Sequence, residues 1–288
     1  MAGKLLITGA AGQLGQALVQ EATRQGWEVV ATDAHDLDIT DPQVVQGELS
    51  RQRPEVVINA AAATRVDDLE SDPDGALRVN AMGPRNLAVA CRRLGVKLIH
   101  LSTDYVFDGT KPGPYVEWDA TSPLSVYGRS KLLGEEWVRQ QCPDHFIVRT
   151  AWLYGMPGPN FVNAILARGR DLAPDGELKV VADQRGTPTS TLALAPQLLA
   201  LAATSAFGTY HATCQGETTW FEFAGLILAT AGITVRVSPC TTAEFPRPAP
   251  RPANSVLENR LLRVAGLDRM PAWQAAYQQF WEAYGDRL

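Results

Sequence analysis

A tyrosine and a lysine stand four residues apart in the segment YGRSK, as Tyr127 and Lys131. On a helix this spacing puts both side chains on one face. A phenol has a reference pKa of about 10, and a nearby ammonium group is expected to lower that pKa by stabilising the phenolate. The pair therefore predicts a proton donor, Tyr127, whose pKa is adjusted by Lys131.

A hydroxyl group that binds the substrate oxygen would complete such a site. Ser102 and Thr103 both qualify, because they lie in STDYVFDG at the carboxyl end of a predicted buried strand. Open α/β sheets bind ligands at such strand ends. Tyrosine and lysine at helical spacing are also common on protein surfaces, so the short motif by itself is weak. The interpretation depends on further motifs that would line the same crevice.

Three glycines near the start of the chain form such a motif. Gly9, Gly12 and Gly15 follow a predicted strand at 4–8 and open a predicted helix at 13–25. Glycine permits close approach of the backbone to a pyrophosphate, and a helix N-terminus offers N–H groups to anionic oxygens. An ordinary strand-to-helix turn would look similar, but Asp33 follows the second strand, where a carboxylate can bind an adenine-ribose hydroxyl. We predict a dinucleotide site that includes Gly9, Gly12, Gln13, Leu14, Gly15 and Asp33.

Two further segments are expected to border the dinucleotide. They are Asp38 and Ile39 near the adenine, and Ala62, Ala63 and Thr64 under the ribose and phosphates. Both segments are equally consistent with ordinary turns. Asp33 favours NADH, since no Lys or Arg lies between positions 33 and 42 to bind a 2′-phosphate, although the distant Arg65 remains a candidate. The choice between NADPH and NADH is therefore left open.

The elements that must position these residues alternate along the chain. Short apolar runs, LLIT, EVVAT, VVINA and KLIHLS, are separated by longer segments of helical period. Continuous apolar runs are typical of parallel strands buried on both faces. We predict an α/β fold with a Rossmann-type, doubly wound parallel sheet, with strands at 4–8, 28–32, 56–59, 97–102 and 145–150 and helices at 13–25, at 74–94 and from about residue 127.

Beyond Tyr154 the chain changes to shorter elements between loops such as MPGPN, APDGE and GTPT. We predict an NAD(P)-binding domain at 1–154, to which later segments can return, and a smaller α/β substrate-binding lobe that occupies most of 155–288. By itself, the proline-rich tract at 245–252 indicates a linker, because proline fixes an extended backbone. The aromatic residues at 219–231 and 272–283 are spaced for core packing, and no chemistry is expected of them.

Composition excludes several classes of protein. Hydrophobic residues make up 45% and charged residues 20% of the chain, as in soluble globular proteins. No apolar run reaches membrane-spanning length, and the first residues lack the apolar core of a signal peptide. The four cysteines show neither zinc nor disulfide spacing, which favours a reduced, cytoplasmic protein. A net charge of −5 without a basic stripe argues against nucleic acid or membrane partners.

The motifs together resemble the dTDP-4-dehydrorhamnose reductase family of the extended short-chain dehydrogenases/reductases. The segments that carry the resemblance are GAAGQLG, NAAA, VNAMGPRNLA, STDYVFDG, SPLSVYGRSKLLGE, RTAWLYG, DQRGTPT and RPANSVL, which span nearly the whole chain. The early motifs indicate only the superfamily, and the later ones narrow it to this family. The resemblance implies reduction of the C4 ketone of a nucleotide sugar, dTDP-4-dehydro-β-L-rhamnose, by NAD(P)H to give dTDP-β-L-rhamnose.

The resemblance also implies roles for individual residues. Tyr127 would protonate the C4 oxygen, Lys131 would also hold the nicotinamide ribose, and Thr103 would polarise the carbonyl. Trp152 is equally well explained as a core residue. A turn cap is an alternative for Asp104 and a loop contact for Gln184, but the family motif favours the site for Asp104 and for Arg251, whose guanidinium suits phosphate. The substrate-binding residues implied by the family are Thr103, Asp104, Trp152, Gln184, Arg251 and Asn254.

The chain departs from the family in two places. Members that dimerise around magnesium carry acidic residues near the first helix and near GTPT, where this chain has Gln16, Ala17 and Thr191. A hard cation would find few ligands there, so we expect no metal site and a monomer or weak dimer. Ala63 replaces a frequent aromatic residue or histidine, which leaves the substrate preference open.

Three alternative functions remain. A nucleotide-sugar epimerase or dehydratase would share the glycine motif and YxxxK but retain its cofactor through an internal redox cycle. A related dTDP-4-keto-6-deoxysugar reductase would give a different stereoisomer at C4. A non-catalytic homologue, such as the beta subunit of methionine adenosyltransferase, would regulate a partner enzyme.

Overall fold

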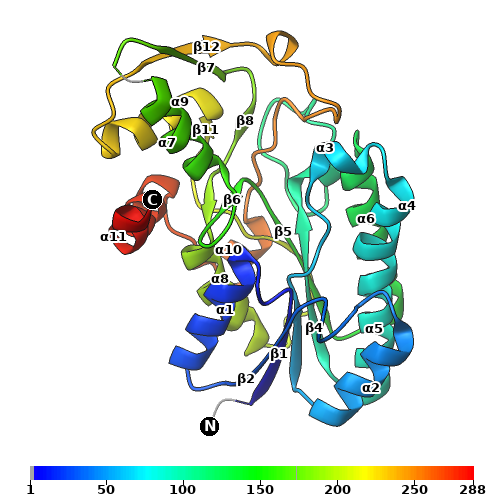
Figure 1. Cartoon of the computed structure of the whole chain (residues 1–288). Helices are drawn as coiled ribbons and strands as arrows, with labels where there is room; N and C mark the ends of the chain where they lie inside the picture. Colours follow the sequence, from blue (N-terminus) through cyan, green and yellow to red (C-terminus); the bar gives the residue numbers. More distant parts are fainter. Residues whose placement is uncertain (1–2, 173) are drawn as a thin grey trace.

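The structure is a computed structural model that describes residues 3–172 and 174–288. Its centre is a six-stranded parallel sheet in the order β10-β5-β4-β3-β1-β2 (Figure 1). The predicted doubly wound α/β fold is therefore confirmed. The strands are β1 (Lys4–Thr8), β2 (Glu28–Thr32), β3 (Val56–Asn59), β4 (Lys97–Thr103), β5 (His145–Thr150) and β10 (Gly208–His211).

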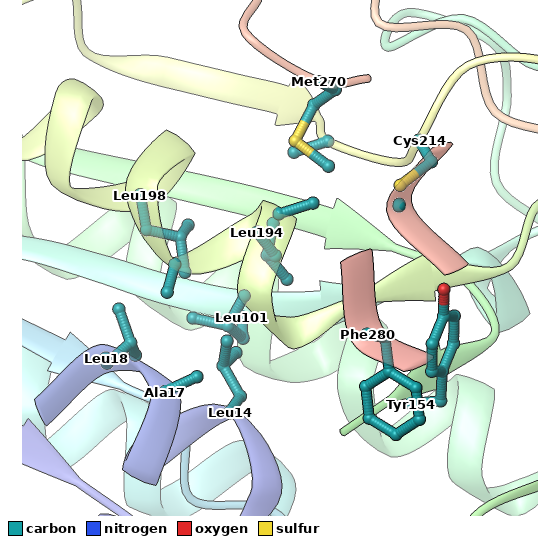
Figure 2. Packing of buried hydrophobic residues seen from close by; sticks show 14 of the residues in the cluster. Leu14, Ala17, Leu18, Leu101, Tyr154, Leu194, Leu198, Cys214, Met270 and Phe280 are labelled. Carbon is teal, nitrogen blue, oxygen red and sulfur yellow. The ribbon is translucent and has the colours of Figure 1, made fainter. Parts of the chain in front are cut away.

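Helices cover both faces of this sheet (Figure 1). One face carries α2 (Pro42–Gln52), α5 (Gly83–Leu94) and α6 (Val126–Gln141), and the other carries α1 (Gln13–Arg24) and α8 (Thr191–Ala202). Successive side chains of a strand point to opposite faces, so Leu5 and Ile7 pack on the α1 and α8 side while Leu6 packs on the α2 and α5 side. Figure 2 shows the contact between α1 and α8, where Leu14, Ala17 and Leu18 lie near Leu194 and Leu198.

The sheet draws its last strand from far along the chain. After the segments around α7 (Phe161–Leu172), the chain returns through α8, which packs on α1, and adds β10 beside β5. The body that contains the sheet thus combines residues 3–150 with residues 191–211.

The remaining elements lie outside the central sheet and the helices that cover it. The parallel pair β7 (Glu177–Val181) and β12 (Arg236–Cys240) packs on α7 and α9 (Trp220–Thr230), at the top of Figure 1. Short pairs join β8 (Arg185–Gly186) to β11 (Thr218–Thr219) and β6 (Leu153–Tyr154) to β9 (Thr189–Ser190). The other elements are α3 (Val66–Leu69), α4 (Pro73–Leu77), η1 (Arg78–Met82), η2 (Asp104–Val106), η3 (Thr242–Glu244), α10 (Arg260–Val264), α11 (Trp273–Tyr284) and η4 (Gly285–Arg287).

The single helix predicted at 74–94 is interrupted. It consists of α4, one turn of π-helix at η1 and then α5. A π-helical turn inside an α-helix is frequent at functional sites, because it shifts one side chain out of the regular spacing. Here that turn carries Asn80, which is fully buried.

Within the described ranges, no helix is long and apolar enough to cross a membrane. The same part of the chain contains no cluster of three or more His, Cys, Asp or Glu side chains that could hold a metal ion. The cysteines are free and buried.

Candidate active site

The glycine-rich turn between β1 and α1 has no room for side chains at two positions. Gly9 has a φ of 68°, and a Cβ there would lie 2.7 Å from the backbone nitrogen of Ala61. A Cβ on Gly15 would lie 2.1 Å from the carbonyl oxygen of Gly9. Glycine at both positions therefore lets the first turn of α1 pack directly on the strand-end loops.

The N-terminus of α1 is left open to a ligand. Its N-cap is Gly12, which provides no side-chain hydrogen bond, and the first turn contains no acidic residue. The first N–H groups of a helix have no intrahelical acceptors and attract anions. Since a Cβ would fill the cradle at Gly9, the residues present fit the pyrophosphate of a dinucleotide.

This turn opens into a cavity of about 470 Å³, the first cavity. It runs along the carboxyl ends of β1, β3, β4 and β5. It brings together thirteen of the residues that the sequence singles out: Gly9, Gly12, Gln13, Leu14, Gly15, Ala62, Thr64, Ser102, Thr103, Asp104, Tyr127, Lys131 and Trp152.

The start of α6 is fixed by two capping contacts. Ser125 Oγ accepts a hydrogen bond from the backbone N–H of Gly128 (3.1 Å), and Glu70 Oε1 accepts one from Val126 N–H (2.8 Å). A capped first turn holds its side chains in place. Tyr127 and Lys131 then face the end of β4, where Lys131 Nζ donates to the carbonyl oxygen of Leu101 (2.6 Å).

Burial controls the protonation of this pair. It raises the pKa of Tyr127 to about 12, opposed by Thr103 and reinforced by the charge of Asp104. It lowers the pKa of Lys131 to about 8, opposed by Glu135. The expected lowering of the Tyr127 pKa by Lys131 is not seen in this structure, because burial dominates the shift and Lys131 is not among the groups that change it.

The structure separates the two hydroxyls at the end of β4. Ser102 Oγ donates to Glu135 Oε1 (2.6 Å), and Glu135 forms a buried ion pair with Arg149. The Ser102 hydroxyl is thus used in this buried network, although the residue also lines the first cavity. Thr103 Oγ1 donates to Asp104 Oδ1 (3.0 Å) and accepts from Tyr105 N–H (3.2 Å), close enough to Tyr127 to influence its pKa.

Asp104 is a buried carboxyl group beside these hydroxyls. Its Oδ2 has no hydrogen-bond partner among the described residues. Burial raises the pKa of Asp104 to about 6. A buried oxygen without a partner is costly, so this atom is suited to accept a hydrogen bond from a bound hydroxyl group.

Trp152 closes the far side of the first cavity. Its φ is 47°, uncommon for a bulky residue and found mainly where tertiary contacts impose it. The indole Nε1 donates to Ser255 Oγ (3.0 Å), and the ring stacks on Trp220. Of the two interpretations, core or site, the structure places this side chain in the wall of the cavity.

A second cavity of about 490 Å³ lies between α7, β7 and the 245–252 segment. It shares two walls, Tyr105 and Trp220, with the first cavity. No acidic side chain is among the described residues that line it. Its cationic residues are Arg168, Lys179, Arg247 and Arg251.

Two predicted substrate residues, Gln184 and Arg251, line this second cavity. Gln184 Oε1 accepts from Trp220 Nε1 (3.2 Å), and its Nε2 donates to Thr242 Oγ1 (3.0 Å). The linker interpretation of 245–252 needs correction, because Ala249 is buried and its N–H donates to Asp67 Oδ1 (3.2 Å).

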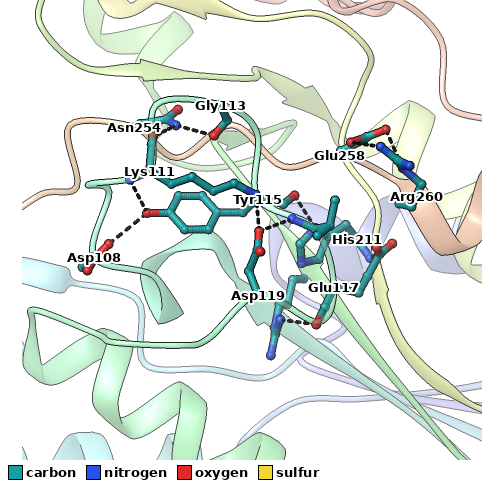
Figure 3. A network of polar contacts seen from close by, with 12 residues as sticks. Asp108, Lys111, Gly113, Tyr115, Glu117, Asp119, His211, Asn254, Glu258 and Arg260 are labelled. Carbon is teal, nitrogen blue, oxygen red and sulfur yellow. Dashed lines mark hydrogen bonds and ion pairs between the residues drawn. The ribbon is translucent and has the colours of Figure 1, made fainter.

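Asn254 has a different place from the one implied by the family. Figure 3 shows its side chain directed at the backbone of Lys111 and Gly113, and Nδ2 donates to both carbonyl oxygens (2.7 and 2.9 Å). Its Oδ1 accepts from Val256 N–H (3.2 Å). Asn254 lines neither cavity and instead holds the 111–113 loop.

Four expected cofactor residues also lie outside the lining of the first cavity. Ile39 is buried in the core under α5, where Gly83 makes room for it, and Asp38 Oδ1 accepts from Thr40 N–H (2.8 Å). These two match the turn interpretation. Asp33 directly follows β2, and its Oδ1 accepts a hydrogen bond from His35 N–H (2.9 Å). The backbone N–H of Ala63 donates to Asn80 Oδ1.

Sequence reasoning missed three residues. Asn80 exchanges hydrogen bonds with the N–H and C=O of Ala63 (2.9 and 3.0 Å) and donates to Ser130 Oγ (3.1 Å), which ties a cavity loop to α6. Tyr105 directly follows Thr103 and Asp104, so its position at a strand end was a usable sign. The sequence carried no sign that Trp220 belongs to the site, because its neighbours on α9 are core residues.

The parallel sheet, the glycine turn and the Tyr127–Lys131 pair define an extended short-chain dehydrogenase/reductase. The family model for the RmlD substrate binding domain matches residues 3–285. The chain therefore belongs to the dTDP-4-dehydrorhamnose reductase family.

Individual relatives agree with this assignment. The chain is 45% identical to a dTDP-4-dehydrorhamnose reductase of Streptomyces griseus, covering 96% of this chain and 93% of the relative. It is 42% identical to a dTDP-4-keto-6-deoxy-D-glucose reductase of Streptomyces niveus, covering 97% and 96%. The crystal structure of dTDP-4-dehydrorhamnose reductase from Bacillus anthracis in complex with NADP is 40% identical, with a TM-score of 0.95 over 98% of this chain and 100% of that chain.

Proposed function

We propose that this protein reduces the C4 ketone of dTDP-4-dehydro-β-L-rhamnose with NAD(P)H to give dTDP-β-L-rhamnose. One observation carries the proposal: Tyr127 and Lys131 line a cavity that begins at the open N-terminus of α1 and adjoins a second, cationic cavity. A nucleotide sugar can thus place its ketone near Tyr127 and its diphosphate among arginines.

The two cavities are consistent with one part of the chain binding the cofactor and another part binding the substrate. Residues up to 154, together with α8 and β10, would form the NAD(P)-binding domain, and most of the remaining chain would form the substrate lobe. The glycine turn would hold the pyrophosphate, and Lys131 the nicotinamide ribose. Ala62 and Thr64 support this arrangement, since they line the same cavity as the glycine turn and Lys131.

The chemistry requires one hydride and one proton. NAD(P)H, when bound at the glycine turn, would supply the hydride that the C4 carbon of the sugar needs. Tyr127 donates its phenolic proton to the C4 oxygen, so the C=O group becomes CH–OH. With a pKa of about 12 the phenol keeps this proton at neutral pH, and the ammonium of Lys131 stabilises the phenolate that forms.

Thr103 and Asp104 would orient the sugar. In this structure the Thr103 hydroxyl donates to Asp104, so polarising the ketone requires that hydrogen to turn towards the substrate. The unpartnered Oδ2 of Asp104 would accept a hydrogen bond from a sugar hydroxyl. Trp152 would contact the apolar face of the deoxysugar.

The decisive experiment is a turnover assay with dTDP-4-dehydro-β-L-rhamnose, with NADH and NADPH compared and the product identified by NMR. We expect one NAD(P)H oxidised for each sugar reduced, whereas an epimerase or dehydratase would show no net oxidation. Tyr127→Phe should lower kcat by about 10² to 10⁴-fold while NADPH binding persists. Failure of the wild-type protein to turn over any dTDP-4-keto sugar would favour the regulatory, non-catalytic alternative.

A second candidate substrate has specific support. The relative from Streptomyces niveus, at 42% identity, is named for reduction of dTDP-4-keto-6-deoxy-D-glucose. Both sugars present a C4 ketone, and the face exposed to the hydride decides the product. Comparing kcat/KM for the two substrates, with the C4 configuration of each product determined by NMR, distinguishes these candidates.

We also propose that the protein is a monomer or weak dimer without bound magnesium. The positions at which related dimers carry acidic residues hold Gln16, Ala17 and Thr191. Light scattering coupled to size exclusion, with either MgCl₂ or EDTA, tests this proposal. A dimer that dissociates in EDTA would contradict it.

A further inference from the structure

An ion pair joins the sheet body to the 245–252 segment. Asp67, on α3, accepts two hydrogen bonds from Arg251: Nη1 to Oδ1 at 2.5 Å and Nη2 to Oδ2 at 2.9 Å. α3 begins two residues after Thr64, which lines the first cavity, and Arg251 lines the second. The pair therefore links a segment that borders the first cavity to a residue that lines the second.

The same carboxylate holds the backbone of the segment. Asp67 Oδ1 also accepts from Ala249 N–H (3.2 Å), and Arg251 Nη1 donates to Ala249 C=O (2.6 Å). Asp67, Ala249 and Arg251 thus form a closed set of contacts. Side chains that are only 26% and 19% exposed, for Asp67 and Arg251 respectively, are held more firmly than a surface ion pair.

The contacts of Arg251 with Asp67 and Ala249 do not use the edge of the guanidinium that carries Nε and Nη2. Arginine has five N–H donors. The bonds to Asp67 and Ala249 use both hydrogens of Nη1 and one of Nη2. The Nε hydrogen and the second Nη2 hydrogen are outside these bonds and form the parallel pair of donors that suits two oxygens of a phosphate. The Tyr105 hydroxyl lies close enough to interact with this guanidinium, so a phosphate would bind beside it.

The local charge still favours an anion. Arg247 Nη1 lies 3.9 Å from Asp67 Oδ2, so two guanidinium groups face one carboxylate. This set carries a net charge of +1. Arg247 and Arg251 both line the second cavity, and Asp67 is outside its lining.

We infer that Asp67 is a positioning residue, which holds Arg251 so that its Nε and Nη2 edge binds a phosphate of the nucleoside diphosphate. The inference rests on the proposed function. An arginine fixed in advance loses less side-chain entropy on binding than a mobile one, so the ion pair strengthens binding instead of competing with it.

The test measures binding of thymidine diphosphate to the full-length protein loaded with NADPH, by calorimetry. Asp67→Asn keeps the shape of the side chain and removes its charge. We expect about tenfold weaker binding, in the range of a lost charge-assisted hydrogen bond. KM for the nucleotide sugar should rise similarly, with kcat and NADPH affinity nearly unchanged.

Asp68→Asn is the matched control, because Asp68 is on the same helix but exposed, and its carboxylate pairs with the exposed Arg65. It should bind thymidine diphosphate like the wild type. Arg251→Lys keeps the charge but not the fork of donors, and should lose about as much affinity as Asp67→Asn. This variant tests the inference even if Asp67→Asn folds poorly.

A double-mutant cycle separates positioning from a general structural role. In an Arg251→Met background, Asp67→Asn should cause no further loss of thymidine diphosphate affinity. An equal loss in that background, tighter binding by Asp67→Asn, or wild-type affinity in Asp67→Asn would each overturn the inference while leaving the proposed function intact. A wild-type protein that does not bind thymidine diphosphate would overturn both.

Discussion

Trp152 and Trp220 lie face to face, with ring centroids 3.4 Å apart and 7° between the ring planes. Each indole is anchored through Nε1, Trp152 to Ser255 Oγ and Trp220 to Gln184 Oε1. Behind Trp152 is Gly186, where a Cβ would lie 2.2 Å from the indole. Distant segments thus build one aromatic wall where the two cavities meet.

Trp220→Ala should weaken substrate binding. Removing one ring of a stacked pair costs about 0.5–1.5 kcal/mol beyond the lost buried area, and Trp152 would lose its support. We expect KM for the nucleotide sugar to rise about fivefold or more, with a smaller change in NADPH affinity. Steady-state kinetics measures both. Trp118→Ala, at a side chain that is 63% exposed, is the control and should leave KM unchanged; an unchanged KM in Trp220→Ala would contradict the role of the wall.

Lys131 should produce a falling limb in the pH dependence of kcat/KM for NADPH, which reports the free enzyme. Because its pKa is lowered to about 8, the ammonium is present below that pH and lost above it. Tyr127, with a pKa of about 12, stays protonated throughout. Lys131→Arg keeps its charge to high pH, so its profile should lack this limb. A limb near pH 8 in both proteins would assign it to another group.

Asp104→Asn should stabilise the fold and impair catalysis. Burial raises the pKa of Asp104 from 3.8 to about 6, so the folded state binds more protons than the unfolded state between these values and stability falls as pH rises through them. Asparagine carries no charge and avoids this loss. The difference in unfolding free energy between variant and wild type should grow from pH 4 to pH 6 and then level off at roughly 1–3 kcal/mol.

Urea unfolding at several pH values measures that difference. KM for the nucleotide sugar should rise in the same variant, since Oδ2 no longer accepts a hydrogen bond. A stability difference that is constant across this pH range would show that Asp104 does not titrate as its burial implies.

Two glycine-to-alanine changes should affect different properties: Gly15→Ala should lower the affinity for NADPH, and Gly47→Ala should raise the stability of the fold. Gly15→Ala places a Cβ 2.1 Å from the Gly9 carbonyl oxygen, so α1 must move away from the turn. We expect NADPH affinity to fall by at least about tenfold, because the N–H groups of α1 lose their position. Gly47→Ala, in the exposed part of α2 with no atom within 4 Å, should stabilise the fold by about 0.5–1 kcal/mol. Fluorescence titration with NADPH and urea unfolding measure these effects.

Features within one strand-turn-helix unit were predictable. The glycine turn and the spacing of Tyr127 and Lys131 depend on periodicities that hold for any strand or helix, and buried parallel strands show themselves as apolar runs. The sequence predicted only that later segments can return to the first domain, and it did not identify α8 and β10. The residues of a strand do not specify which other strand it pairs with.

The sequence by itself determined the class of fold, the pair of residues Tyr127 and Lys131 on which the chemistry depends and, through its motifs, the family. Tertiary structure decided which hydroxyl faces the site, that Trp220 is a wall, and that Asp67 meets Arg251 across 184 positions of the chain. It also decided that the pKa of Tyr127 is raised and not lowered. The physical reason is common to all four: burial and long-range contacts arise only when distant segments pack, whereas spacing along a helix or strand is local.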